Sequence, residues 1–279
     1  MKIIKYKNFE VRPLAGALGA EILDINLNKI EDETFNEIYK AFIDYQVIGI
    51  PNQKLSSDEY LEFGRRWGKI HHYPYMKGLE SHPEILEILK TETDTYAFGN
   101  VWHSDGSFTE VPPKATMLYA QELPPAGGDT LFADMYQAYD TLSDTMKNIL
   151  DNLKGLYVGD QPLAQFSGAK SMKQKNPGKT QVKSYHPIIR THPDSKNKAL
   201  YIGGHTVEIE GMSREESVPI INYLKSHSTR PEFICRFKWE PGSIAIWDNR
   251  CTQHYAVDDY AGFRRRMHRI TILGEEAPY

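Results

Sequence analysis

The sequence predicts a mainly-β α+β fold, an antiparallel sandwich or jelly roll with peripheral helices. Most of the chain after residue 114 consists of short strand-like runs separated by turn sequences such as "PPAGGD" and "EPGS". These runs seldom alternate with helical patterns, as the βαβ units of a parallel sheet would require. The chain has 279 residues, 40% of them hydrophobic, and shows no linker or internal repeat. We therefore expect a single domain over residues 1–279.

The N-terminal part carries the predicted helices. Apolar residues recur at spacings of three and four over residues 31–45 and again over residues 57–67, which predicts two amphipathic helices. Between them, "VIGIP" predicts a short buried strand. "EILEILK" (residues 84–90) fits either a strand or a helix, and the flanking "SHP" and "TETDT" favour a strand.

Strands dominate the rest of the chain, and two helices interrupt them. The first is expected over residues 136–153, and the second over residues 213–226, where Ser213 and Glu216 form a capping-box pattern. The polar stretch over residues 159–180 fits two interpretations equally well: a lid or binding loop, or a surface insertion. The predicted strands lie in "ATMLYAQEL", "DTLFADM", "YHPIIRTHP", "ALYIGG", "FICRFKWEPGSIAIWDN" and "RRMHRITILG".

Charge and cysteine content limit the possible partners and compartment. The net charge of −4 gives no support for nucleic-acid binding, which usually needs a basic face. The two cysteines, Cys235 and Cys251, do not suggest a disulfide framework. "MKIIKYKNFEVRP" lacks a signal-peptide core, and no apolar run approaches the length of a membrane span. We expect a cytoplasmic protein that binds neither nucleic acid nor membrane.

The stretch "NVWHSDGSF" suggests part of a metal site. In an extended segment, His103 and Asp105 would point to the same face because they are two positions apart. Two histidines and one carboxylate form the facial triad of non-haem Fe(II) oxygenases. With ten histidines in the chain, however, one His-x-Asp also arises readily by chance. His254 is the best candidate for a third ligand, because it follows a buried strand and a turn in "AIWDNRCTQHYAV".

The basic run "RRRMHRITILG" is the second candidate feature. If it forms a strand, Arg265, Met267 and Arg269 share one face, and both arginines would point inward. Buried arginines are costly unless anions neutralise them. A solvated basic face is the alternative, but an anionic cosubstrate beside a metal would explain both features together.

Several of these segments, in this order, resemble the taurine dioxygenase/TfdA family of Fe(II)- and 2-oxoglutarate-dependent dioxygenases. The resemblance covers nearly the whole chain, from "VRPLAGALGAEILDINL" to the last strand, and implies a double-stranded β-helix, a jelly-roll variant. The segments that carry it are "WHSDGSF", "PPAGGDTLFADM", "YHPIIRTHP", "LYIGG" and "WDNRCTQHYAVDDY" followed by "RRRMHRITILG".

The resemblance implies roles for individual residues. His103, Asp105 and His254 would bind Fe(II), and Thr130 and Arg265 would bind the cosubstrate 2-oxoglutarate. It implies no catalytic residue beyond the iron ligands.

The substrate would lie against a further set of residues. In "KIHHYPYMKG" we choose His71 and Tyr73 as contacts, with His72 and Tyr75 as the alternatives. Upstream of His103, either Gly99 or Asn100 can match the family's asparagine, and we choose Asn100. The predicted substrate-binding residues are Arg269, His71, Tyr73, Asn100 and Gly106.

The implied reaction is the O2-dependent hydroxylation of a small anionic substrate. An alkanesulfonate such as taurine is the first expectation, with release of sulfite, an aldehyde, succinate and CO2. An aryloxyalkanoate, an alkyl sulfate or another small carboxylate is the alternative. A different class, a non-catalytic or Zn²⁺-dependent hydrolytic jelly roll, is disfavoured by the inward arginines and by "GGDT". We expect a homo-oligomer, either a dimer or a tetramer.

Overall fold

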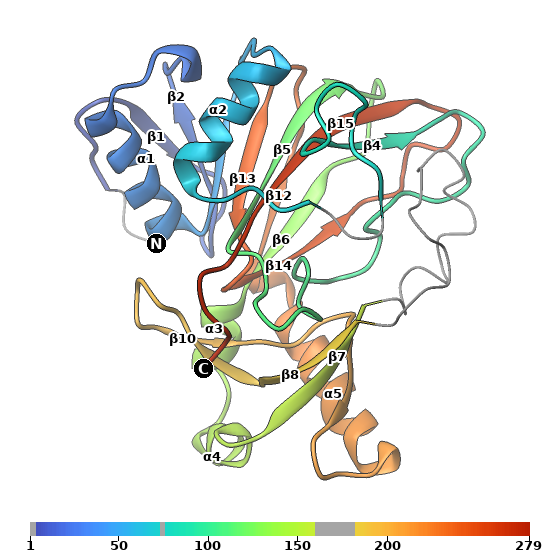
Figure 1. Cartoon of the computed structure of the whole chain (residues 1–279). Coiled ribbons are helices and arrows are strands. Elements are labelled where there is room, and N and C mark those ends of the chain that lie inside the picture. Colours follow the sequence, from blue (N-terminus) through green and yellow to red (C-terminus); the bar gives the residue numbers. More distant parts are fainter. Residues whose placement is uncertain (1–3, 73–75, 160–181) are drawn as a thin grey trace.

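The computed structural model describes residues 4–72, 76–159 and 182–279. Strands form most of the regular structure and helices lie around them, so the mainly-β prediction with peripheral helices is confirmed (Figure 1).

The largest sheet has seven strands in the order β1-β2-β3-β13-β5-β15-β4. The pairs are antiparallel except for β2 and β3, which run parallel. The strand favoured for residues 84–90 is confirmed as β4. The bounds are β1 (Glu10–Pro13), β2 (Ala20–Leu23), β3 (Val47–Ile50), β13 (Ile244–Asp248), β5 (Ala115–Glu122), β15 (Arg265–Ile272) and β4 (Leu86–Lys90).

A three-stranded antiparallel sheet packs against one face of the large sheet. Its order is β12 (Ile234–Phe237), β6 (Thr130–Asp134) and β14 (Thr252–Ala256). One apolar cluster joins both sheets, and it includes Trp247 and Met267 of the large sheet and Phe132 of the small one. His254 of β14 and Arg269 of β15 lie where these two sheets face each other.

Two helices, α1 (Asp32–Tyr45) and α2 (Ser57–Trp67), cover the opposite face of the large sheet (Figure 1). They contribute Phe42 and Trp67 to a second apolar cluster, which also contains Ile246 and Ile270 from the sheet. β13 serves both clusters because its side chains alternate, and all five of its residues are buried. Both helices match the predicted ranges to within one residue.

Apart from η1 (Leu27–Lys29), whose Leu27 belongs to the second cluster, the remaining elements form the lower part of Figure 1 around a third apolar cluster. One antiparallel sheet has the order β11-β7-β8, and β9 pairs with β10. The predicted capping box is present at Ser213, where α5 begins. The bounds are α3 (Met135–Asp140), α4 (Asp144–Leu150), β7 (Lys154–Val158), β8 (Lys183–Pro187), β9 (Ile189–Thr191), β10 (Lys198–Leu200), β11 (Thr206–Ile209), α5 (Arg214–Ser228) and η3 (Pro231–Phe233).

The prediction of one helix over residues 136–153 was wrong. The chain forms α3 and α4 instead, and β7 begins at Lys154. α3 ends at Asp140, and the N–H of its C-cap Thr141 donates to the Gln137 carbonyl. α4 starts anew because the side chain of its N-cap Ser143 accepts the Met146 N–H. The helical periodicity continues across this break and hides it.

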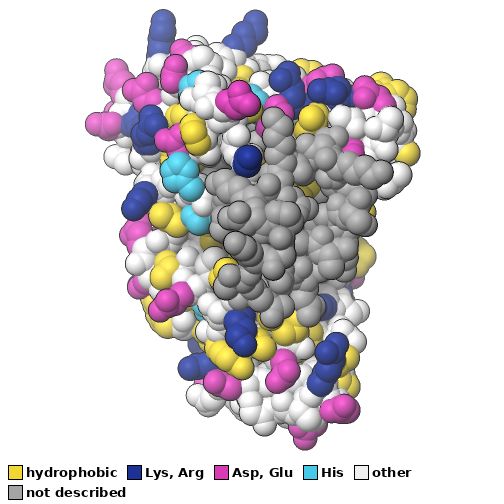
Figure 2. Space-filling model, turned by 45° about the vertical axis from the view of Figure 1, so that its right-hand side comes forward, with side chains coloured by type: hydrophobic (Ala, Val, Ile, Leu, Met, Phe, Trp, Pro, Cys, Tyr) yellow, Lys and Arg dark blue, Asp and Glu magenta, His cyan; other side chains and the backbone are white. Residues whose placement is uncertain are grey.

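Two further sequence predictions can be placed. Residues 160–181, which include nearly all of the predicted lid or insertion, lie outside the described residues. Among the helices that are described, none has both the length and the apolar character to cross a membrane. In the face shown in Figure 2, acidic and basic side chains are interspersed.

The contact between β3 and β12 gives a test of the packing. A Cβ atom at Gly49 would lie 2.3 Å from Phe237 Cε2, so we expect Gly49→Ala to lower the free energy of unfolding by about 1–3 kcal/mol. Gly16→Ala is the matched control, since no atom lies within 4 Å of the corresponding position. Urea unfolding of both variants measures the difference. Equal stabilities for the two variants would contradict the described packing.

Candidate metal centre

The fold brings His103, Asp105 and His254 together. His254 lies in the middle of β14, and the segment that carries His103 pairs with it through an isolated antiparallel bridge. The His103 N–H donates to the His254 carbonyl over 3.1 Å, and the reverse bond is 2.8 Å. One possible ligand atom from each of the three side chains lies within 4.8 Å of the other two.

Asp105 is the most constrained member of the group, with only 3% of its surface exposed. Its Oδ1 lies 2.9 Å from Arg269 Nη2, 3.5 Å from His103 Nε2 and 3.7 Å from His254 Nε2. Burial acts to raise the pKa of Asp105, but the Arg269 charge and the two imidazoles outweigh it and hold the pKa well below its usual value. The carboxylate is therefore ionised at neutral pH.

Two polar residues that the sequence analysis missed fix the orientation of Asp105. The Thr116 hydroxyl donates to Asp105 Oδ2 over 2.7 Å, and the Asp105 N–H donates to Asn249 Oδ1 over 3.2 Å. Asn249 Nδ2 in turn donates to the Thr116 hydroxyl over 2.9 Å. Thr116 could have been noticed in the predicted strand "ATMLYAQEL", because a polar residue two positions from Leu118 shares its face of β5.

The histidines present nitrogen atoms suited to a metal ion. His103 Nδ1 lies 2.7 Å from the Val101 carbonyl, so Nδ1 carries the proton and Nε2 is left as an acceptor. Burial, followed by the nearby His103, lowers the pKa of His254 well below its usual value and keeps the ring neutral. Its Nδ1 has no hydrogen-bond partner among the described residues. Two neutral imidazoles and one carboxylate are the donor set that a divalent iron ion takes.

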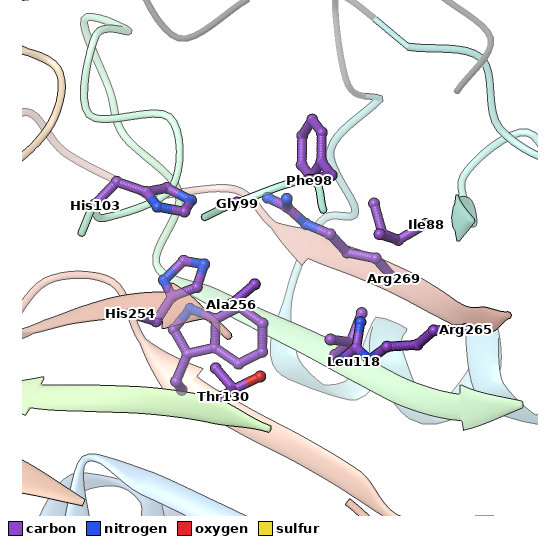
Figure 3. A pocket seen from close by; sticks show the side chains of 11 residues that line it. Ile88, Phe98, Gly99, His103, Leu118, Thr130, His254, Ala256, Arg265 and Arg269 are labelled. Atoms are coloured by element: carbon purple, nitrogen blue, oxygen red, sulfur yellow. The ribbon is translucent and has the colours of Figure 1, made fainter. Parts of the chain in front are cut away.

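A cavity beside the two histidines extends along β15 (Figure 3). Arg265 and Arg269 both face it and both are only 5% exposed, so they point inward as predicted. Thr130 lines the same cavity from β6. Its remaining lining is mostly apolar and comes from Ile88, Phe98, Gly99, Leu118, Trp247 and Ala256.

Arg265 is a buried cation with unused hydrogen-bonding capacity. Its Nε has no hydrogen-bond partner among the described residues, and burial lowers its pKa. Its guanidinium lies 5.8 Å from the Trp239 ring centroid, and Trp239 Nε1 donates to the Thr130 hydroxyl over 3.0 Å. Gly128 has a left-handed φ of 72°, and a Cβ there would come within 3.1 Å of Arg265 Cδ. The "GGDT" segment thus leaves room for Arg265.

A second, smaller cavity adjoins Arg269. Arg269 lines both cavities, while His71 and Gly106 line only the second. Three of the predicted substrate-binding residues therefore meet around one space. Tyr73 lies outside the described residues. The Asn100 side chain bonds to Tyr255 and to the Ala256 carbonyl, and the neighbouring Gly99 lines the first cavity instead.

Another buried group, His192, Asp248 and Cys251, has ligand-type atoms at similar separations. His192 Nδ1 accepts the N–H groups of Asp194 and Ser195, so its Nε2 donates to Asp248 Oδ2 over 3.0 Å. Both ring nitrogens are thereby used. Burial also raises the pKa of the Cys251 thiol well above its usual value. This group is a structural network and does not suit a metal ion.

Comparison with known proteins agrees with the geometry. Residues 10–271 match the family model described as "Taurine catabolism dioxygenase TauD, TfdA family". The chain is 32% identical to an alpha-ketoglutarate-dependent sulfate ester dioxygenase of Pseudomonas putida over 273 residues, covering 95% of this chain and 90% of the relative. It is 30% identical to an alkylsulfatase of Acinetobacter baylyi over 277 residues, which is 96% of this chain and 86% of that protein.

Solved structures give the same result. The crystal structure of a taurine dioxygenase from Burkholderia xenovorans superimposes with a TM-score of 0.83 at 29% sequence identity, covering 98% of this chain and 91% of the other.

His186 forms a hydrogen bond to the segment that follows the candidate ligand Asp105. The pH dependence of the free energy of unfolding tests its environment. Its Nε2 lies 2.9 Å from the Thr109 carbonyl, and burial lowers its pKa to about 4. In the unfolded chain the pKa is about 6.5, so between these values the unfolded state binds a proton that the folded state does not. The stability is full above pH 6.5 and falls as the pH drops towards 4.

We therefore expect metal-free His186→Gln to lose stability less steeply than the original protein between pH 7 and pH 4.5. Urea unfolding at a series of pH values measures the slopes. His72→Gln, at an exposed position, is the control and should keep the original slope. An unchanged slope in His186→Gln would contradict the lowered pKa.

Proposed function

Since this chain belongs to the taurine catabolism dioxygenase TauD, TfdA family and is an Fe(II)- and 2-oxoglutarate-dependent dioxygenase, we propose that it hydroxylates a small organic sulfonate or sulfate ester. The observation that carries the proposal is the position of Arg269. This one buried cation lines both the cavity beside the two histidines and the smaller cavity that contains His71. An anionic group held there would place the adjoining carbon next to the metal ligands.

His103, Asp105 and His254 are proposed to hold the iron. Two imidazoles and one carboxylate would leave open coordination positions on the metal, as an oxygenase requires. Together with 2-oxoglutarate and O2, bound iron supplies the oxidising power that converts a substrate C–H bond to C–OH, while 2-oxoglutarate becomes succinate and CO2. The polypeptide keeps the ligand carboxylate oriented through Thr116 and Asn249.

Thr130 and Arg265 are proposed to bind the distal carboxylate of 2-oxoglutarate. The Thr130 hydroxyl accepts the Trp239 N–H, so its own proton is directed to another acceptor. Arg265 lines the same cavity with Nε lacking a partner among the described residues. A carboxylate between the two would neutralise the buried guanidinium and accept from both groups.

Arg269, His71 and Gly106 are proposed to position the substrate, with Tyr73 and Asn100 as further contacts predicted from sequence. Apolar side chains such as Phe98 and Leu118 exclude competing water from the cavity. Hydroxylation of the carbon next to sulfur, or next to the ester oxygen, gives an unstable product. Its hydroxyl loses a proton, a C=O bond forms, and the C–S or C–O bond breaks to release sulfite or sulfate with an aldehyde.

The finer features of the fold belong to the same proposal. The two facing sheets that share one apolar cluster support a double-stranded β-helix. Strands of the large sheet contribute to both major clusters, which supports a single domain over residues 1–279. A homo-oligomeric state and a cytoplasmic location stay predictions of the sequence.

A substrate panel tests the proposed activity. With Fe(II), O2 and 2-oxoglutarate, we expect taurine, a longer alkanesulfonate or an alkyl sulfate to increase succinate formation, with matching release of sulfite or sulfate. His103→Ala should abolish both iron binding and succinate formation. Stimulation by aryloxyacetates alone would assign the substrate to aryloxyalkanoates. If no compound stimulates succinate formation and Zn²⁺ binds in preference to Fe(II), the proposed function is wrong.

Neighbouring arginines on β15 test the cosubstrate site. Arg265→Gln removes a buried charge that faces the cavity, so we expect the KM for 2-oxoglutarate to rise about 10- to 100-fold with iron retained. Arg266→Gln is the matched control, because its side chain is 40% exposed on the opposite face. Steady-state succinate formation measures both. Equal KM values for the two variants would remove Arg265 from the assigned role.

A further inference from the structure

A separate cavity of about 220 Å³ lies away from the metal centre. None of its lining residues lines either of the two cavities beside Arg269. Its walls come from distant parts of the chain: Tyr39 of α1, Arg190 of β9, Arg250 of the turn after β13, and the segment that follows β15. The metal-centre chemistry proposed above does not use this space.

Two of the three basic residues in this cavity already have acidic partners. Lys114 Nζ lies 3.0 Å from Glu275 Oε1. Arg250 Nη1 lies 2.8 Å from Asp194 Oδ2, and its Nη2 lies 2.6 Å from the buried Asp248. These pairs neutralise the two cations without any bound molecule.

Arg190 is the exception. It is only 3% exposed, and neither its Nε nor its Nη1 has a hydrogen-bond partner among the described residues. Its guanidinium packs 5.0 Å from the Tyr201 ring centroid, which does not neutralise its charge. Burial without a neutralising anion is costly, because the contact with Tyr201 replaces only part of the solvation that the guanidinium loses.

We propose that this cavity binds a small oxyanion through Arg190. Sulfate, phosphate and small carboxylates share the required chemistry, since each offers several oxygen acceptors to guanidinium N–H groups. A water molecule takes about 30 Å³ of the liquid, so the cavity has room for a polyatomic anion. Water alone would satisfy the hydrogen bonds of the Arg190 guanidinium but would leave its charge without a counter-ion.

Three carboxylates of the chain line the same cavity, and since Asp194 and Glu275 are already paired with Arg250 and Lys114, Glu276 is left as a competitor for Arg190. Glu276 lines the cavity from the exposed segment after β15. If its side chain neutralised Arg190, the cavity would have no place for a free anion. A test must therefore separate an anion from solution from the carboxylate of Glu276.

Crystals grown with selenate, an anomalously scattering analogue of sulfate, give a direct test. We expect an anomalous peak within hydrogen-bond distance of the Arg190 guanidinium. If the peak is missing from the original protein but present in Glu276→Gln, the chain fills its own site and the proposal is wrong. A peak missing from both proteins also overturns it.

Thermal unfolding gives a second readout that does not depend on activity. At matched ionic strength, sulfate should raise the Tm of the original protein more than chloride does. Arg190→Gln should weaken the sulfate affinity derived from this shift by about tenfold or more. Arg214→Gln, at the exposed start of α5, is the control and should keep the original response. An undiminished response in Arg190→Gln contradicts the proposal, and if that variant does not fold, the selenate result decides.

Discussion

The buried negative charge of Asp105 is the interaction on which the candidate centre depends. A carboxylate that is 3% exposed persists only because Arg269, two imidazoles and the Thr116 hydroxyl surround it. These partners come from β15, β14 and β5 and from the segment that carries His103. To neutralise the Asp105 carboxylate, strands of the large sheet and of the small sheet must bring these partners to the same point.

The alternation of side chains along β15 connects this requirement to the core. Arg265, Met267 and Arg269 face the small sheet, while Ile270 and Ile272 pack against the helices on the other face. A register shift of one residue would bury the isoleucines beside the metal ligands and turn the arginines towards α2. The pairing of β15 with β4 and β5 thus determines both the inward direction of the two arginines and the hydrophobic packing on the other face.

Local patterns predicted much of this arrangement, and long-range contacts account for the rest. The two-residue spacing of His103 and Asp105 and the alternation around Arg265 are local, and both could be read from the sequence. Asn249 could not, because its role depends on a contact 144 residues away in the chain. The break between α3 and α4 was missed although Ser143 is a good capping residue, because the apolar periodicity continues through it.

The turn after β13 joins the two sites. Asn249 binds the Asp105 backbone on one side, and the next residue, Arg250, lines the separate cavity on the other. Asp248 holds this turn through Arg250 and His192, and these partners outweigh burial to keep the pKa of Asp248 well below its usual value. The Asn249 N–H also donates to the carbonyl of Lys114, which lies two residues before Thr116. The segments that line the separate cavity are therefore the same segments that carry the hydrogen-bond partners of Asp105. The buried ion pair between Asp248 and Arg250 therefore holds the turn that places Asn249 against the candidate ligand Asp105.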